Sequence, residues 1–360
     1  MCESGEQVLS DVHVYVPPSS QLINEGHAIT RFYFEIPDSS SQLVSSPSRK
    51  TPHTAQENVC WSSAKQRLES RHLESHDDDD DDGDDDDESV AMATVDEDGD
   101  LVVVRKRRSH CELQNVIVIN HSMATTLDSV GLQVWQGCLL LCDFLLTHRE
   151  MFKGRVALEM GSGVGLASIV MATAASHVFA TDTGTNVLEM CQRNIDHNCH
   201  NLVGYSDKSE EKAVVQVREL DWLQSTKSTD DPGPFQWSDK DIEKLEEVTV
   251  IIAADVVYDD DLTDAFFNTL IRLMSTGKDK TAFLALEKRL NFTIQDLDVT
   301  CKAYDHFRWH ITRLTSSQDV KYCVELLPID FPLCFQYRRT EQLEKESAVS
   351  LWSGASNYRS

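Results

Sequence analysis

The stretch that decides the fold is VALEMGSGVGLASIVMATAASHVFATD, residues 156–182. It opens with an apolar run, Val156–Met160, of the length expected for a buried parallel strand. Three glycines follow that run at alternate positions: Gly161, Gly163 and Gly165. Small and apolar residues then predict a helix over Leu166–Ala175, and His177–Ala180 predicts a second strand that leads into Asp182. The order is strand, glycine turn, helix, strand and acid.

This order is typical of a nucleotide site. Glycines permit a tight turn and let a ligand lie against bare backbone. An acid at the end of the second strand can accept hydrogen bonds from the two ribose hydroxyls. Gly161 and Asp182 are separated by the roughly 20 residues that this arrangement requires. The glycine pattern alone fits both dinucleotides and S-adenosylmethionine.

Glu159, two residues before the first glycine, distinguishes the two ligands. A carboxylate there repels a pyrophosphate but suits the cationic methionyl end of S-adenosylmethionine. We therefore predict S-adenosyl-L-methionine as the cofactor, bound by Glu159, the three glycines and Asp182. The alternatives are a dinucleotide enzyme and a core that keeps its glycines only for packing.

The chain is strongly acidic, with a formal charge of −27 over 360 residues and eleven acidic residues between Asp77 and Glu88. This charge argues against direct binding to nucleic acid and favours a basic protein partner. The ten cysteines are scattered, as in reduced proteins of the nucleus or cytoplasm. Cys191, His197, Cys199 and His200 match no zinc pattern, so we predict no metal site. We also expect no membrane association, because no signal peptide or apolar run of transmembrane length stands out.

Composition divides the chain into four parts. Residues 1–36 contain two β-type runs, 8–16 and 28–36, and form an N-terminal β extension. Residues 37–100 are too polar and acidic to form a core, which predicts a disordered acidic insert. The main domain is expected over 101–340 and a loose tail over 341–360. The basic run Arg105–Arg108 is either a nuclear import signal or a charged turn.

The main domain reads as alternating strands and helices. Further strands are predicted over Ala213–Leu220, Val248–Ala254 and Thr281–Leu286, with helices over Thr185–Asn198 and Leu262–Met274. The last strands are expected at His310–Arg313, Tyr322–Leu327 and Phe335–Arg338. This alternation predicts an α/β fold with a parallel, doubly wound, Rossmann-like sheet and an antiparallel hairpin at one edge.

Polar residues at the carboxyl ends of these strands are the candidate site, because ligands of such sheets bind there. Asp221 can accept a hydrogen bond from the adenine amino group, and Trp222 can form an apolar wall. Trp135 either covers the ligand or plugs the core.

The candidate catalytic residues are Asp255 and Tyr258, expected to face the methyl group and a lysine nucleophile. Asp255 could pass the lysine proton to water. The alternative is that Asp255 caps the following helix and Tyr258 belongs to the core. Residues 255–258 read Asp-Val-Val-Tyr. Adenine-N6 and glutamine methyltransferases have Asn/Asp-Pro-Pro-Tyr at this point, so the sequence argues against a planar nitrogen substrate.

The order of several motifs resembles the methyltransferase-like family of protein lysine methyltransferases, a branch of the class I, seven-strand enzymes. The matching segments are GLQVW from Gly131, LEMGSGVGLASI from Leu158, ATDTGTNVLEMCQRNI from Ala180, LDW from Leu220, DVVY from Asp255 and EKR from Glu287. Gln136 departs from the family, whose members often have proline there. The resemblance covers roughly residues 115–339.

The resemblance implies S-adenosylmethionine-dependent methylation of a lysine in a non-histone protein. Chaperones, translation factors and nucleic-acid-associated proteins are common substrates of such enzymes. It also implies that Trp135, the Glu159–Gly165 turn, Asp182 and Trp222 contact the cofactor, and that Asp255 and Tyr258 line the substrate channel. The alternatives are a small-molecule or RNA methyltransferase, and an inactive methyltransferase fold that serves as a binding module.

Overall fold

A computed structural model describes most of the main domain and parts of the N-terminal extension. The described residues are 8–9, 20–24, 26–37, 94–95, 101–102, 115–198, 214–224, 233–289, 291–293, 298–316, 322–344 and 348–353. The predicted acidic insert, 37–100, lies outside them except for residue 37 and β4 (Thr94–Val95), which pairs antiparallel with β5 (Leu101–Val102). The basic run Arg105–Arg108 also lies outside the described residues.

The main unit is built on a seven-stranded sheet in the order β10-β9-β8-β11-β12-β16-β15. Its first five strands are parallel neighbours. Their bounds are β8 (Val156–Met160), β9 (His177–Asp182), β10 (Val214–Glu219), β11 (Val250–Ala254) and β12 (Thr281–Ala285). The strand order reverses between β8 and β11, which is where ligands bind in doubly wound sheets.

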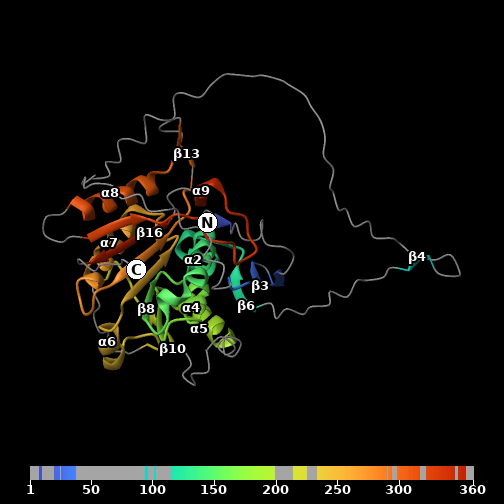
Figure 1. The fold of residues 1–360 in the computed structure, drawn as a ribbon, viewed down its shortest axis with the longest axis horizontal. Helices are drawn as coiled ribbons and strands as arrows, with labels where there is room; N and C mark the ends of the chain where they lie inside the picture. Colours follow the sequence, from blue (N-terminus) through green and yellow to red (C-terminus); the bar gives the residue numbers. More distant parts are fainter. Residues whose placement is uncertain are drawn as a thin grey trace, which may run out of the picture. The chain divides into compact units, whose positions relative to one another are not determined.

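Helices cover both faces of this sheet (Figure 1). The helices of one face are α2 (Gln136–Thr147), α4 (Leu166–Met171) and α5 (Thr185–Asn198), and those of the other include α7 (Asp260–Met274) and α8 (Lys302–Ser316). Alternate strand residues enter the two cores: Ala157 and Ile252 pack on the first, Leu158 and Ile251 on the second. A continuous apolar strand is expected when both faces are covered.

The end of the chain differs from its prediction. Residues 341–360 were expected to form a loose tail, but they contain α9 (Glu341–Glu344) and β16 (Ala348–Ser353). β16 lies between β12 and β15 (Tyr322–Leu326) and pairs antiparallel with both. The edge of the sheet is therefore completed by the segment nearest the end of the chain, because β16 satisfies the hydrogen-bonding edge of β12.

Two predicted strands are absent from the described part of the chain. His310–Arg313 lies inside α8, and Phe335–Arg338 forms only an isolated bridge, between Phe335 and Phe34. The strand prediction over Tyr322–Leu327 is confirmed by β15. Short elements that the sequence did not predict include α6 (Asp239–Leu245), β13 (Asn291–Thr293) and β14 (Asp298–Thr300).

The N-terminal extension forms a small antiparallel sheet in the order β2-β3-β6. Its strands are β2 (Ser20–Asn24), β3 (His27–Phe34) and β6 (Asn115–Ser122), while β1 (Val8–Leu9) pairs with β7 (Ala124–Thr125). The run 28–36 was correctly predicted as a strand, and it pairs with β2 as a hairpin. Asn194 and Asn198 of α5 each bond both the amide and the carbonyl of a β6 residue, which covers the outer edge of β6.

Helix α2 is held in place by a buried carboxylate. Asp143 is fully buried and accepts hydrogen bonds from the backbone amides of Cys334 and Phe335, at 2.8 and 3.0 Å. Its other oxygen accepts from the Tyr337 hydroxyl at 2.8 Å and from Arg339 at 2.7 Å. A buried charge with this many donors is satisfied, so it fixes α2 against the segment that follows β15.

The short 3₁₀ helix η3 (Leu127–Leu132) precedes α2, and α3 (Arg149–Phe152) follows it. By length and composition the stretch Leu127–Thr147 could cross a membrane, which differs from the sequence expectation. In the structure 67% of an 18-residue window within that stretch is buried. Leu139, Leu140 and Leu145 are part of the core on one face of the sheet.

Candidate active site

The glycine turn between β8 and α4 has the backbone that its residues predict. Gly161, Gly163 and Gly165 have φ angles of +74°, +51° and +88°, in the region that side chains other than glycine rarely adopt. The amides of Gly161 and Ser162 both donate to the carbonyl oxygen of Thr181, at 2.9 Å. The turn is thereby fixed to the end of β9.

Close packing also excludes side chains from this turn. A methyl group at Gly161 would lie 2.7 Å from Val256 Cγ1 and 3.4 Å from the Trp222 ring. A methyl group at Gly163 would lie 2.8 Å from the carbonyl oxygen of Gly131. The glycines therefore bring the ends of β8 and β11 and the η3 segment together around bare backbone, which is the surface that a nucleoside ligand needs.

Glu159 lies beneath the turn, with only 1% of its surface exposed. Its carboxyl group accepts a hydrogen bond from the Ser168 hydroxyl of α4 at 2.5 Å. Burial raises its pKa to about 8, against the lowering effect of the Ser168 bond. The group is thus largely protonated at neutral pH, and a cation above the turn would favour its ionised form.

Asp182, the acid at the end of β9, is hydrogen-bonded to the glycine turn. One oxygen accepts from the amide of Gly163 and the other from the amide of Thr183, both at 2.7 Å. Burial raises the pKa of this carboxyl group, and the two amides oppose the shift. Each carboxylate oxygen has a second lone pair, so Asp182 can accept further hydrogen bonds.

Trp222 forms a wall beside the turn. Its ring lies near Gly161 and packs edge-on against Phe266, with ring centroids 5.2 Å apart. Its indole nitrogen is buried and has no hydrogen-bond partner among the described residues. Asp221 accepts from the amide of Leu223 at 2.9 Å.

Asp255 has the only positive φ among the described non-glycine residues, at +52°. Its two oxygens accept from the amide of Gly137 in α2 at 2.6 Å and from the amide of Glu287 after β12 at 2.7 Å. The alternative prediction, that Asp255 caps the following helix, is wrong: Asp259 caps α7 by accepting from the amide of Leu262. Asp255 instead joins the start of α2 to the ends of β11 and β12.

Tyr258 is 36% exposed at the same edge, so it is not a core residue. Its partial burial raises its pKa to about 12, and the negative charges of Asp182, Asp259 and Asp128 add to the shift. The negative charges of these three carboxylates, here called the acidic rim, therefore act on one phenol. Tyr258 is a neutral hydrogen-bond donor at physiological pH.

Trp135 stands at the entrance to α2 and is half-buried rather than a core plug. Its indole nitrogen donates to the carbonyl oxygen of Val130 at 3.1 Å, and the Arg289 guanidinium lies 4.2 Å from its ring centroid. Gln136, the residue that departs from the resemblance, begins α2 and is 3% exposed, with a buried amide oxygen that has no partner among the described residues. Helix α2 therefore starts at this position without the usual proline.

The structure brings the predicted residues together at one edge of the sheet, where the five parallel strands end. This strand order, with its reversal between β8 and β11 and its antiparallel β16, is the fold of the class I, seven-strand methyltransferases. The bare glycine backbone and the neighbouring carboxylates fit their cofactor, S-adenosylmethionine, which is cationic at its methionyl sulfonium.

The comparisons with known proteins define the class further. The model of a protein family described as lysine methyltransferase matches residues 114–298, and the chain belongs to that family. It is 38% identical to Methyltransferase-like protein 22 of Mus musculus, over 94% of this chain and 95% of that protein. It is 43% identical to Methyltransferase-like protein 22 of Homo sapiens, over 71% of this chain and 70% of that protein. The chain is therefore an S-adenosylmethionine-dependent protein-lysine methyltransferase by family.

Among solved structures, the similarity in sequence is lower. The O-methyltransferase TomG from Streptomyces achromogenes, in complex with SAM, has a TM-score of 0.34 and 15% sequence identity. The match covers 61% of this chain and 78% of that chain.

Proposed function

We propose that this enzyme methylates a lysine in a basic, non-histone protein, and that the acidic rim selects the substrate. The observation that carries the proposal is the negative potential that Asp128, Asp182 and Asp259 exert at the Tyr258 hydroxyl group, at the edge of the sheet where the parallel strands end. A negative rim attracts the lysine ammonium group and disfavours anionic substrates. The formal charge of −27 extends the same preference to the surroundings of the target lysine.

We assign the cofactor to the glycine turn. Asp182 receives the ribose hydroxyls, Trp222 packs against the adenine, Asp221 accepts from its amino group, and Trp135 covers the methionyl side. Glu159 acts from beneath the turn, where its ionisation balances the positive charge of the ligand. When bound, S-adenosylmethionine supplies a methyl group on a sulfonium, whose leaving group is a neutral thioether.

The lysine must be neutral before it can attack. Both Asp255 oxygens already accept a backbone amide, so we assign Asp255 a positioning role instead of the proton transfer that the sequence suggested. Tyr258, with its raised pKa, is a poor base and serves as a donor or as one wall of the lysine channel. The ammonium proton therefore leaves to water, while the acidic rim holds and aligns the side chain.

The sequence of the acidic insert supports the proposal of a basic partner. Its eleven acidic residues between Asp77 and Glu88 could raise the local concentration of a basic protein, a molecular chaperone among the candidates. The run Arg105–Arg108 and the scattered cysteines support residence in the nucleus or cytoplasm. Because such long-range attraction is screened by salt, its contribution depends on ionic strength.

The proposal is tested by transfer of labelled methyl from S-adenosylmethionine into a cell lysate. We expect discrete labelled proteins of basic character that release methyllysine after hydrolysis. Asp128→Asn removes one charge of the acidic rim and should raise the KM for the protein substrate about two- to fivefold, in line with a partly screened charge. Asp196→Asn, an exposed acid of α5, is the matched control and should leave KM unchanged.

Removal of residues 77–88 gives a second test. The shortened chain should capture the labelled substrate more slowly at low salt and at the same rate at high salt. If the shortened chain and the parent capture the substrate at equal rates at every salt concentration, the insert acts only as a spacer. Label in RNA or in small molecules, in place of protein, would contradict the assignment of a lysine substrate.

A further inference from the structure

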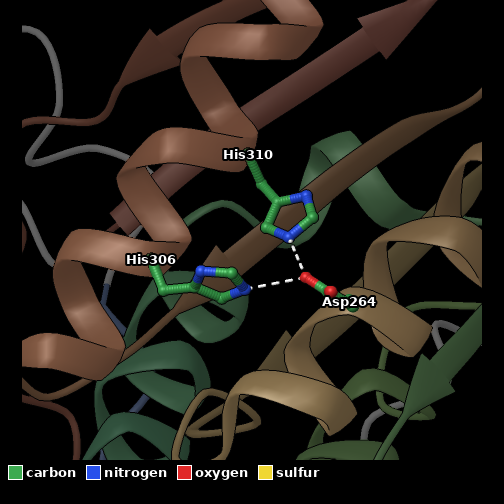
Figure 2. A group of neighbouring side chains, drawn as sticks. All are labelled: Asp264, His306 and His310. Carbon is green, nitrogen blue, oxygen red and sulfur yellow. Dashed lines mark hydrogen bonds and ion pairs between the residues drawn. The ribbon is translucent and has the colours of Figure 1, made fainter.

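Three potential metal ligands converge between α7 and α8, away from the glycine turn. Asp264 comes from the second turn of α7, and His306 and His310 come from one face of α8 (Figure 2). The Nε2 atoms of both imidazoles lie 2.7 Å from the same oxygen, Asp264 Oδ1. All three ligand atoms lie within 4.8 Å of one another.

The geometry suits a transition-metal ion. Histidines at positions i and i+4 of a helix project from one face, so His306 and His310 present their nitrogens side by side. Zinc binds imidazole nitrogen and carboxylate oxygen at about 2.0–2.2 Å, which separates tetrahedral ligand atoms by about 3.4 Å. The present 2.7 Å contacts would have to open by only about 0.7 Å to admit the ion, within the reach of small side-chain rotations.

Both imidazole rings are already oriented by neighbouring aromatic residues. The His310 ring is stacked on Phe267, with centroids 4.4 Å apart and planes 7° apart. The His306 ring is stacked on Trp309, with centroids 5.8 Å apart and planes 12° apart. Ligands whose rings are preset lose little conformational freedom on binding a metal.

The exposure of the group also favours an ion. The Asp264 side chain is 52% exposed, His306 26% and His310 10%, so the group is open to solvent on the carboxylate side. An ion pair requires only one imidazole, whereas here two imidazoles share a single carboxylate oxygen. Arg313, which packs on Trp309, is a cation near His310, and its charge opposes the binding of a metal ion.

We propose that Asp264, His306 and His310 form a binding site for a divalent transition-metal ion of the zinc class. Two imidazoles and one carboxylate are ligands that Zn²⁺, Ni²⁺ and Cu²⁺ accept, and the open side leaves a fourth position for water. The ion links α7, which starts just after Tyr258, to α8. It therefore stabilises the packing of α8 against α7, the helix that follows β11 of the active-site edge.

The direct test is a calorimetric titration of Zn²⁺ into the full chain, purified without a histidine tag and freed of metal. We expect one equivalent of zinc whose affinity falls by more than about 100-fold in His306→Gln and in Asp264→Asn, since loss of outer groups alone costs 10–100-fold. His197→Gln replaces an exposed histidine of α5 and is the matched control, expected to bind as the parent does.

A spectroscopic readout separates this site from the cysteines. Cu²⁺ bound at His306 should quench the fluorescence of Trp309, which is 50% exposed and stacked on that imidazole. The quenching should be lost in His306→Gln and in Trp309→Phe, while circular dichroism confirms that each variant keeps its fold. Zinc binding of equal affinity in the parent, His306→Gln and Asp264→Asn, or an equal loss in His197→Gln, would overturn the proposal.

Discussion

The backbone amide of Gly137 lies 2.6 Å from Asp255 Oδ2, and the two residues are 118 positions apart in the chain. The bond joins the first turn of α2 to the end of β11, and the second Asp255 oxygen extends the link to Glu287 after β12. A carboxylate at the amino end of a helix is favoured by the unpaired amides there. A single side chain therefore links three segments of the active-site edge, and the backbone of this residue has φ of +52°.

Gly137→Ala should disrupt this link. A methyl group at Gly137 would lie 2.6–2.7 Å from all three atoms of the Asp255 carboxylate group, so the carboxylate must move. We expect a loss of about 1–3 kcal/mol in the free energy of unfolding, the usual cost of overpacking, together with a large loss of turnover. Urea unfolding and methyl transfer measure the two effects. Gly233→Ala is the matched control, since the nearest atom to its added methyl is 4.0 Å away; equal effects of both substitutions would contradict the role of Gly137.

Asp255→Asn distinguishes positioning from proton transfer. Asparagine tolerates the positive φ of this residue but places an NH₂ group opposite one of the two backbone amides. Stability should fall by about 1–3 kcal/mol, the cost of an unsatisfied buried donor, and turnover should fall with it. If Asp255 only positions the site, the pH profile of the remaining activity keeps its shape. A profile that loses an ionisation in the variant would show instead that Asp255 accepts the lysine proton.

Asp182→Ala should weaken cofactor binding more than it lowers the stability of the fold. The variant loses the predicted hydrogen bonds to the ribose and the existing contacts with the amides of Gly163 and Thr183. We expect the dissociation constant for S-adenosylmethionine to rise by the equivalent of about 1–3 kcal/mol, measured by calorimetry. Asp196→Ala, an exposed acid of α5, should bind the cofactor normally. Unchanged affinity in Asp182→Ala would remove Asp182 from the cofactor site.

Glu159 should make stability depend on pH. Its pKa is raised from 4.5 to about 8 in the folded chain, so the folded state holds a proton that the unfolded state releases. Its contribution is fully favourable below pH 4.5 and is lost as the pH rises to about 8, by up to about 5 kcal/mol. Glu159→Gln removes this dependence, so the variant should lose less stability than the parent between pH 5 and pH 8. Urea unfolding across that range is the measurement, and identical slopes for the two proteins would contradict the raised pKa.

Helix α8 shows where local patterns were misread. Tyr304, Phe307, Ile311 and Leu314 are buried at a spacing of three and four residues, which is the helical period. The strand predicted at His310–Arg313 disregarded this period and is wrong. The same period would have placed His306 and His310 on one face, one turn apart, and so indicated a pair of metal ligands.

Strand β16 could not be placed by any local pattern. It is a short run near the end of the sequence. One partner, β12 over residues 281–285, is distant in the chain, and the other, β15 over residues 322–326, is separated from it by α9. Strand pairing is set by hydrogen bonds between segments, so the propensity of one segment does not reveal its neighbour. Asp143 of α2 likewise meets Cys334 and Tyr337 only when α2 packs against the segment after β15.

The sequence by itself determined the strand, glycine turn, helix, strand and acid of residues 156–182, because each of these features depends on neighbours within a few residues. It also indicated the cofactor through Glu159, and the edge of the sheet at which the site lies. The tertiary structure alone decided that Asp255 bonds Gly137 and Glu287, that the charges of the acidic rim act on Tyr258, and that Asp264 meets His306 and His310. These contacts join segments far apart in the chain, and their geometry is fixed by the packing of helices on the sheet rather than by any local preference.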